Sequence, residues 1–108
     1  MTTVTIFKDK TGIYKGFEVS GHAGYSKSGN DIVCAALSML TTNTINSIET
    51  FTDDFFSYEE DEKSGYMKLS LDEDSSHDTQ LLIDSMNLGL SQLSKAYKKY
   101  VRLIIEEV

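Results

Sequence analysis

Apolar residues in this chain change their spacing from every second position to every third or fourth position, and they do so twice. The first spacing is typical of a strand with one buried face, and the second is typical of a helix. Val4 and Ile6 begin a two-residue alternation, which resumes between Ile13 and Ser20, and helical spacing starts near Asp31. The same succession then repeats. It predicts two pairs of strands, each followed by a helix.

We expect the first helix to run from Asp31 to about Glu49, after a loop rich in glycine and serine that ends at Asn30. Asn30 or Asp31 is suited to capping its start, because short polar side chains accept hydrogen bonds from unpaired N–H groups. The apolar stripe of this helix consists of Val33, Leu37, Leu40, Ile45 and Ile48, and it continues towards Phe51.

The second half repeats the pattern. Residues 55–59 and 66–71 are strand candidates, and the acidic segment 60–65 turns between them, which predicts a hairpin. The stretch 75–78 has the Ser-x-x-Asp form of a helix start. Residues 101–108 are β-branched and partly alternating, so they indicate a last strand, with a continuing helix as the open alternative. The stripe of the second helix consists of Leu82, Met86, Leu90, Leu93 and Tyr97.

These patterns predict a single small domain over residues 1–108 with the order ββαββα(β). A chain of 108 residues buries roughly two-thirds of its unfolded surface and leaves no residues for a second core. The fold class is α/β (α+β), with a mixed sheet and two helices packed on it. With 40% hydrophobic and 25% charged residues, the composition is that of an ordinary globular domain.

The charge balance limits the partners. Ten basic residues stand against 17 acidic ones, which gives a net charge of −7 and disfavours binding to nucleic-acid phosphates. A basic partner suits this charge better. The N-terminal stretch lacks the apolar core of a signal peptide, and no run approaches the ~18 apolar residues of a membrane span. We expect a cytoplasmic protein that binds neither nucleic acid nor membrane.

The chain has one cysteine and two histidines. A single cysteine forms no internal disulfide, and the histidines and cysteine do not have the spacing of a zinc-binding set. We therefore expect no metal site and no cofactor.

His22 and Cys34 are the residues best suited to chemistry. If the first helix starts at Asp31, Cys34 lies in its first turn, where unpaired N–H groups and the helix dipole favour a thiolate. His22 follows directly after the second strand, and the loop from Gly24 to Asn30 would allow its imidazole to reach the thiol. The pair then has the parts of a cysteine nucleophile and its base.

Each of these residues also has a structural interpretation. Cys34 stands among apolar residues, as a buried cysteine does, and His22 fits a simple loop residue. Asp31 is explained as a cap, and its negative charge opposes a thiolate at Cys34. Ser38 shares a helix face with Cys34, and it either lines the same pocket or packs. His77 fits a solvated surface histidine.

Two stretches of the sequence, Gly21-His22-Ala23-Gly24-Tyr25 and residues 29–38, resemble the signature of the ribosomal-processing cysteine protease family Prp. The second stretch reads GNDIVCAALS. The resemblance implies an endopeptidase that removes the N-terminal extension of the basic large-subunit ribosomal protein numbered twenty-seven, cutting after a phenylalanine. It implies a catalytic dyad of His22 and Cys34, with Asp31 and Ser38 as possible supporting residues.

The resemblance also implies a homodimer and a mobile loop over the substrate, here with Gly24, Tyr25 and Gly29. Many relatives carry a proline near the tail, where this chain has Ala96 to Tyr100, so the boundary between the second helix and the last strand stays open.

The start of the first helix also offers hydrogen-bond donors for catalysis. Backbone N–H groups near Ile32 to Ala35 are the expected donors to the oxyanion of a tetrahedral intermediate.

Two other classes of function remain open from the sequence. The first is a ribosome-assembly module that binds the same basic protein without cutting it, with Cys34 structural. The second is an inactive or redox-responsive relative in which Cys34 is a sensor thiol. Cleavage of the extension separates the first from a protease. Reversible oxidation of Cys34 that changes partner affinity without turnover would identify the second.

Overall fold

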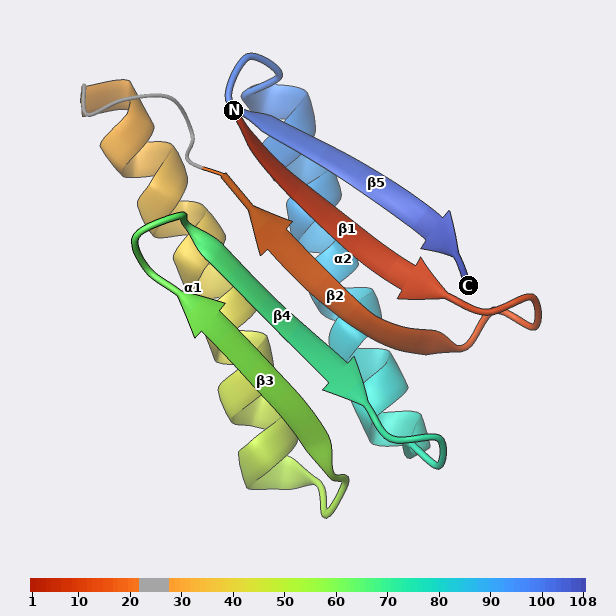
Figure 1. Cartoon of the computed structure of the whole chain (residues 1–108). Helices are drawn as coiled ribbons and strands as arrows, with labels where there is room; N and C mark the ends of the chain where they lie inside the picture. The colour runs from red at the N-terminus through yellow and green to blue at the C-terminus, as the bar shows by residue number, and fades with distance from the viewer. Residues whose placement is uncertain (22–27) are drawn as a thin grey trace.

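The computed structural model describes residues 1–21 and 28–108, with residues 28–31 described by their backbone alone (Figure 1). Its elements follow the order ββαββαβ, which confirms the predicted order and the presence of a last strand. The elements are β1 (Thr2–Lys8), β2 (Tyr14–Ser20), α1 (Ser28–Phe51), β3 (Phe56–Asp61), β4 (Tyr66–Leu71), α2 (His77–Ala96) and β5 (Val101–Glu107).

The five strands form one mixed sheet in the order β3-β4-β2-β1-β5. β1 pairs in parallel with β5, and the other neighbours pair antiparallel. The parallel pair needs a long crossover, which α1, the second hairpin and α2 supply. The C-terminal segment is a strand because Val101 and Leu103 pair with Thr2 and Val4 and face the core with them.

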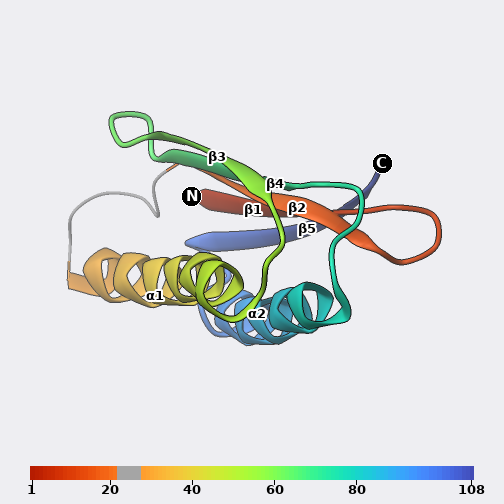
Figure 2. The ribbon, with the colours of Figure 1, turned by 90° about the horizontal axis from the view of Figure 1, so that it is seen from below.

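Both helices cover the same face of the sheet, as Figure 2 shows. Val4 and Ile6 of β1 are fully buried on that face, with Phe17 and Val19 of β2 beside them. The predicted alternation of both strands is thereby confirmed. The helices approach closely at Gly89, where an added Cβ would lie 2.7 Å from a Leu40 methyl carbon, Cδ2. The remaining buried apolar side chains are Tyr14, Val33, Leu37, Ile48, Leu69, Ile83, Met86, Leu90 and Val101.

The start of α1 differs from the prediction. The helix begins at Ser28, three residues before Asp31, and ends at Phe51, two residues beyond Glu49. Gly29 and Asn30 therefore lie in the helix and not in the preceding loop. Their low helix propensity suggested a loop, but extending an existing helix costs little once its buried residues anchor it.

The second hairpin is confirmed, with a shifted first strand. β3 ends at Asp61, so Glu60 and Asp61, which were expected in the turn, pair with Met67 and Tyr66 of β4. Acidic residues have low strand propensity, and here they are tolerated because β3 is an edge strand exposed to water.

The buried stripe of α2 is also rotated slightly from the predicted one. Met86 and Leu90 are buried as expected, but Ile83 takes the place of Leu82, which is half-buried. Tyr97 is no longer helical: its N–H group donates to the Leu93 carbonyl as the helix ends. The boundary that the sequence left open therefore lies at Ala96, where α2 ends without a proline.

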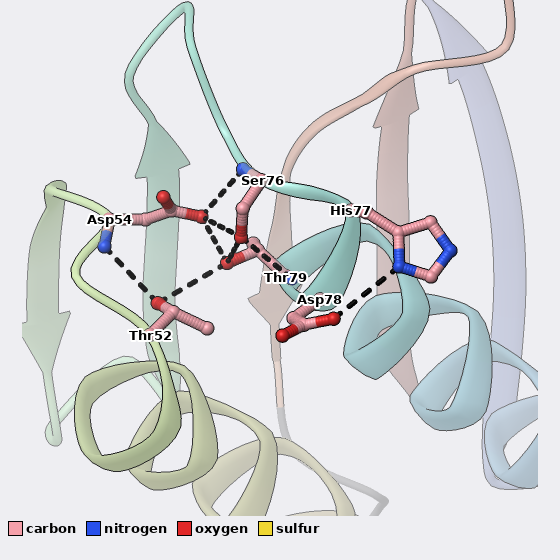
Figure 3. Close-up of polar contacts among 6 residues, drawn as sticks. All are labelled: Thr52, Asp54, Ser76, His77, Asp78 and Thr79. Carbon is pink, nitrogen blue, oxygen red and sulfur yellow. Dashed lines mark hydrogen bonds and ion pairs between the residues drawn. The ribbon is translucent and has the colours of Figure 1, made fainter.

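The start of α2 is fixed by a polar network around Asp54 (Figure 3). Ser76 caps the helix by accepting a hydrogen bond from the Thr79 N–H group at 3.3 Å. One carboxylate oxygen of Asp54 accepts hydrogen bonds from the Ser76 N–H group at 2.7 Å, from its hydroxyl at 2.8 Å, and from the Thr79 hydroxyl. The hydroxyl of Thr79, and then the Ser76 N–H group, lower the pKa of the Asp54 carboxyl.

We expect Asp54→Asn to lower the free energy of unfolding at pH 7 by about 1 kcal/mol, because it removes the charge from these hydrogen bonds. A lowered pKa in the folded state means that the stabilisation is complete above the ordinary aspartate value of 3.8 and is lost as pH falls through the lower folded value. Urea unfolding at pH 7 and at pH 3 measures both effects. Asp53→Asn, at an exposed neighbour, is the matched control and should change little; an equal loss in both variants would contradict this role of Asp54.

Candidate active site

Cys34 lies on an exposed part of α1, between two buried residues. Val33 is fully buried and Leu37 is 5% exposed, whereas the free thiol side chain of Cys34 is exposed. Because each helical residue turns by about 100°, Cys34 lies at the edge of the buried stripe. The interpretation of Cys34 as a buried apolar residue is therefore wrong.

The early start of α1 changes the surroundings expected for the thiol. Counted from Ser28, Cys34 is the seventh residue of the helix and lies beyond its first turn. The four N–H groups that lack helical partners precede Ile32 in such a helix. The oxyanion donors predicted near Ile32 to Ala35 are therefore wrong, because those N–H groups have partners one turn earlier.

A cleft of about 270 Å³ opens beside Cys34, between α1 and the hairpin of β3 and β4. The turn of this hairpin lies over the N-terminal half of α1 (Figures 1 and 2). Ser38 and Thr42, one and two helical turns after Cys34, continue the α1 wall. The other lining residues are Thr2, Val19, Gly21, Leu37, Thr41, Tyr58, Glu60, Asp61, Glu62, Gly65, Tyr66 and Met67.

Thr41 and Ser38, two hydroxyl residues on the α1 wall, differ in how far they are buried. Thr41 is buried, and its hydroxyl donates to the Leu37 carbonyl at 3.0 Å, so it serves the helix backbone. Ser38 is exposed and lines the cleft, which decides between the two interpretations of this residue.

The opposite wall carries a tyrosine and carboxylates. Tyr58 is 42% exposed, and burial together with the neighbouring Glu60 carboxylate raises the pKa of its hydroxyl. The tyrosine stays protonated near neutral pH, and its hydroxyl donates a hydrogen bond to the Glu60 carboxylate. This wall was not predicted from the sequence, although Tyr58 and Glu60 stand two positions apart in a predicted hairpin, a spacing that puts two strand residues on one face.

The chain enters the cleft just before His22. β2 ends at Ser20, and Gly21 lines the same cleft as Cys34. Gly21 has a φ of +91°, and a Cβ there would lie 2.8 Å from the Met1 carbonyl oxygen, so both the conformation and the space favour glycine. His22, Gly24 and Tyr25 lie outside the described residues.

The other residues singled out from the sequence lie apart from the thiol or are known by their backbone alone. Asp31 lies within α1, three residues before Cys34, and its side chain is outside the description. His77 is confirmed as a surface residue: its side chain is 85% exposed, and its Nδ1 lies 3.4 Å from an Asp78 carboxylate oxygen.

Among the side chains that the structure describes, those of residues 1–21 and 32–108, no three histidine, cysteine or acidic groups are placed so that they could hold a metal ion. None of the described helices is long and apolar enough to cross a membrane.

Comparison with known proteins agrees with this geometry. The model of the family described as Cysteine protease Prp matches residues 1–102. A ribosomal processing cysteine protease Prp of Staphylococcus aureus is 26% identical over 103 residues, which cover 95% of this chain and 97% of the relative. The protein of that name from Bacillus subtilis is 29% identical over 91 residues, 81% of each chain.

Solved structures share the whole fold. A Streptococcus mutans protein has a TM-score of 0.90 and 35% identity, and the match covers 100% of this chain and 96% of the other. The Staphylococcus aureus protease Prp with a covalently linked product peptide has a TM-score of 0.90 and 25% identity, covering 98% and 100% of the two chains. In that relative a peptide product has been captured as a covalent adduct.

Because the Cys34 side chain is exposed, we expect iodoacetamide to alkylate it in the folded protein at neutral pH about as completely as in denaturant. Intact-protein mass measures the labelled fraction over time, and Cys34→Ser, which removes the single cysteine, is the control for labelling elsewhere. A thiol that stays unlabelled until the chain unfolds would contradict its exposed place beside the cleft.

Proposed function

Because this chain belongs to the Prp family of cysteine proteases, we propose that it removes the N-terminal extension of the large-subunit ribosomal protein numbered twenty-seven, cutting after a phenylalanine. The observation that carries the proposal is the exposed thiol of Cys34 on the wall of a cleft that is open to a peptide. The relatives named ribosomal processing proteases support it. The substrate is the one that the signature in residues 21–38 implies.

The proposed dyad is Cys34 as nucleophile and His22 as acid and base. Gly21 lines the cleft, and the next residue in the sequence is His22, which supports this pairing. His22 accepts the thiol proton, or pairs with a thiolate already formed, and Cys34 Sγ attacks the carbonyl carbon of the scissile peptide bond.

The tetrahedral intermediate then collapses. The carbon–nitrogen bond breaks, the amine leaves with the proton from His22, and the N-terminal product stays on Cys34 as a thioester. Water attacks the thioester with His22 as base, the product leaves as a carboxylic acid, and Cys34 regains its thiol. No metal or cofactor takes part in these steps.

The remaining parts of the proposal concern surroundings and partners. Ser38, one turn along α1 from Cys34, contacts the bound peptide from the same wall. The net charge of −7 suits a basic ribosomal protein and disfavours direct contact with nucleic acid. In this proposal the protein acts in the cytoplasm as a homodimer.

We expect the purified protein to shorten the full-length ribosomal protein at one bond, and Cys34→Ala to leave it intact, because alanine has no nucleophile. Mass spectrometry of the substrate after incubation under reducing conditions identifies the bond. Binding without cleavage by the unaltered protein would contradict the proposal and favour a ribosome-assembly module.

We expect His22→Ala to reduce turnover by roughly 100-fold or more, the scale of lost acid–base help, while the folded state persists. His77→Ala is the matched control, because His77 is the other histidine and lies on the surface at the start of α2. Peptide cleavage rates and thermal unfolding are measured for both. Equal rates in the two variants would remove His22 from the mechanism.

A further inference from the structure

The cleft beside Cys34 is bounded on its far side by the edge strand β3, and two of its side chains face the helices. Tyr58 pairs with Leu69 and Glu60 pairs with Met67 across β3 and β4. Directly opposed residues in a sheet share a face. Leu69 is fully buried and Met67 packs against the core, so Tyr58 and Glu60 project to the side where α1 lies.

Glu59, the residue before Glu60 on β3, faces the other side of the sheet. Glu59 pairs with Lys68, whose ammonium group lies 5.3 Å from the centre of the Phe7 ring. These residues belong to the face of the sheet that no helix covers (Figure 2). Glu59 and Glu60 therefore carry the same charge on adjacent positions of one strand, with only Glu60 directed towards the cleft.

The cleft carries an excess of negative charge. Glu60, Asp61 and Glu62 line it, and its described lining residues include no lysine, arginine or histidine. Asp61 already accepts a hydrogen bond from the Lys63 backbone N–H group at 3.1 Å. Burial, the charge of Glu60 and the hydrogen bond that Glu60 accepts from the Tyr58 hydroxyl raise the pKa of Tyr58. Because an exposed carboxylate accepts several hydrogen bonds, Glu60 can also receive a basic side chain.

We propose that Glu60 is a specificity-determining residue that receives a lysine or arginine side chain of the substrate close to the scissile bond. This inference rests on the proposed function, because it takes the peptide to lie in the cleft with its reacting carbonyl at Cys34. The thiol on α1 and the carboxylate on β3 line one cleft of about 270 Å³, so a single short peptide contacts both walls. A basic side chain gains an opposite charge there, and an acidic one meets repulsion.

The test uses two peptides that contain the extension and differ only in whether one residue placed next to the cut is lysine or glutamine. We expect the unaltered protein to prefer the lysine peptide by about two- to five-fold in kcat/KM at low salt, the range of an exposed charge pair, and less at high salt. Glu60→Gln should remove the preference. Glu59→Gln, with the same change in net charge, should keep it.

A binding measurement separates this inference from the proposed function. Fluorescence anisotropy of both labelled peptides with Cys34→Ala protein reports charge preference whether or not cleavage occurs. Cleavage of both peptides at equal rates, with equal binding, would overturn the role of Glu60 and leave the protease intact. Absence of cleavage with a retained, Glu60-dependent binding preference would overturn the proposed function alone. Loss of the preference in Glu59→Gln as much as in Glu60→Gln would also contradict the inference, because the whole protein field would then explain it.

Discussion

The burial of one face of α1 against the sheet fixes the direction of the thiol, and the rest of the site depends on it. Val33 and Ile48 are fully buried and Leu37 nearly so, which sets the rotation of the helix about its axis. At about 100° per residue, Cys34 and Ser38 then fall on one flank of the buried stripe, facing the hairpin of β3 and β4. Loss of that packing would turn the Cys34 thiol away from the cleft without any change in its chemistry.

The cleft also depends on the order of the strands in the sheet, which brings distant parts of the sequence to one end of the molecule. β2 ends at Ser20 and the next residue, Gly21, lines the cleft, while β3 and β4 supply its outer wall from residues more than thirty positions later. The polar network around Asp54 lies at the start of α2 and ties that helix to the segment after α1. The cleft beside Cys34 and the Asp54 network therefore occupy separate places in this small domain.

Much of the fold was predictable because apolar spacing reports directly on burial. The alternation of Val4 and Ile6 and the order of elements were predicted correctly. The start of α1 was not, because Gly29 and Asn30 have low helix propensity and only the tertiary structure shows that the helix extends over them. The far wall of the cleft was missed for a related reason: the approach of the hairpin to α1 is a long-range contact, and local spacing carries no information about it.

The candidate site was likewise predicted only in part from the sequence. Recognition of the signature around Cys34 predicted the family, which the match over residues 1–102 confirms. The predicted reason for a reactive thiol, a place in the first turn of the helix, was wrong, because Cys34 is one turn further along. What the structure shows instead is that the thiol is exposed beside a cleft of about 270 Å³.

The most direct test of the account is labelling by a chloromethyl ketone peptide that carries the sequence of the extension up to its phenylalanine, mapped by fragmentation mass spectrometry. The account predicts one adduct, on Cys34, formed faster than with a scrambled peptide and slowed by excess substrate. Labelling at another residue, or equal labelling of Cys34 by the scrambled peptide, would contradict the claim that this thiol attacks a peptide bound in the cleft.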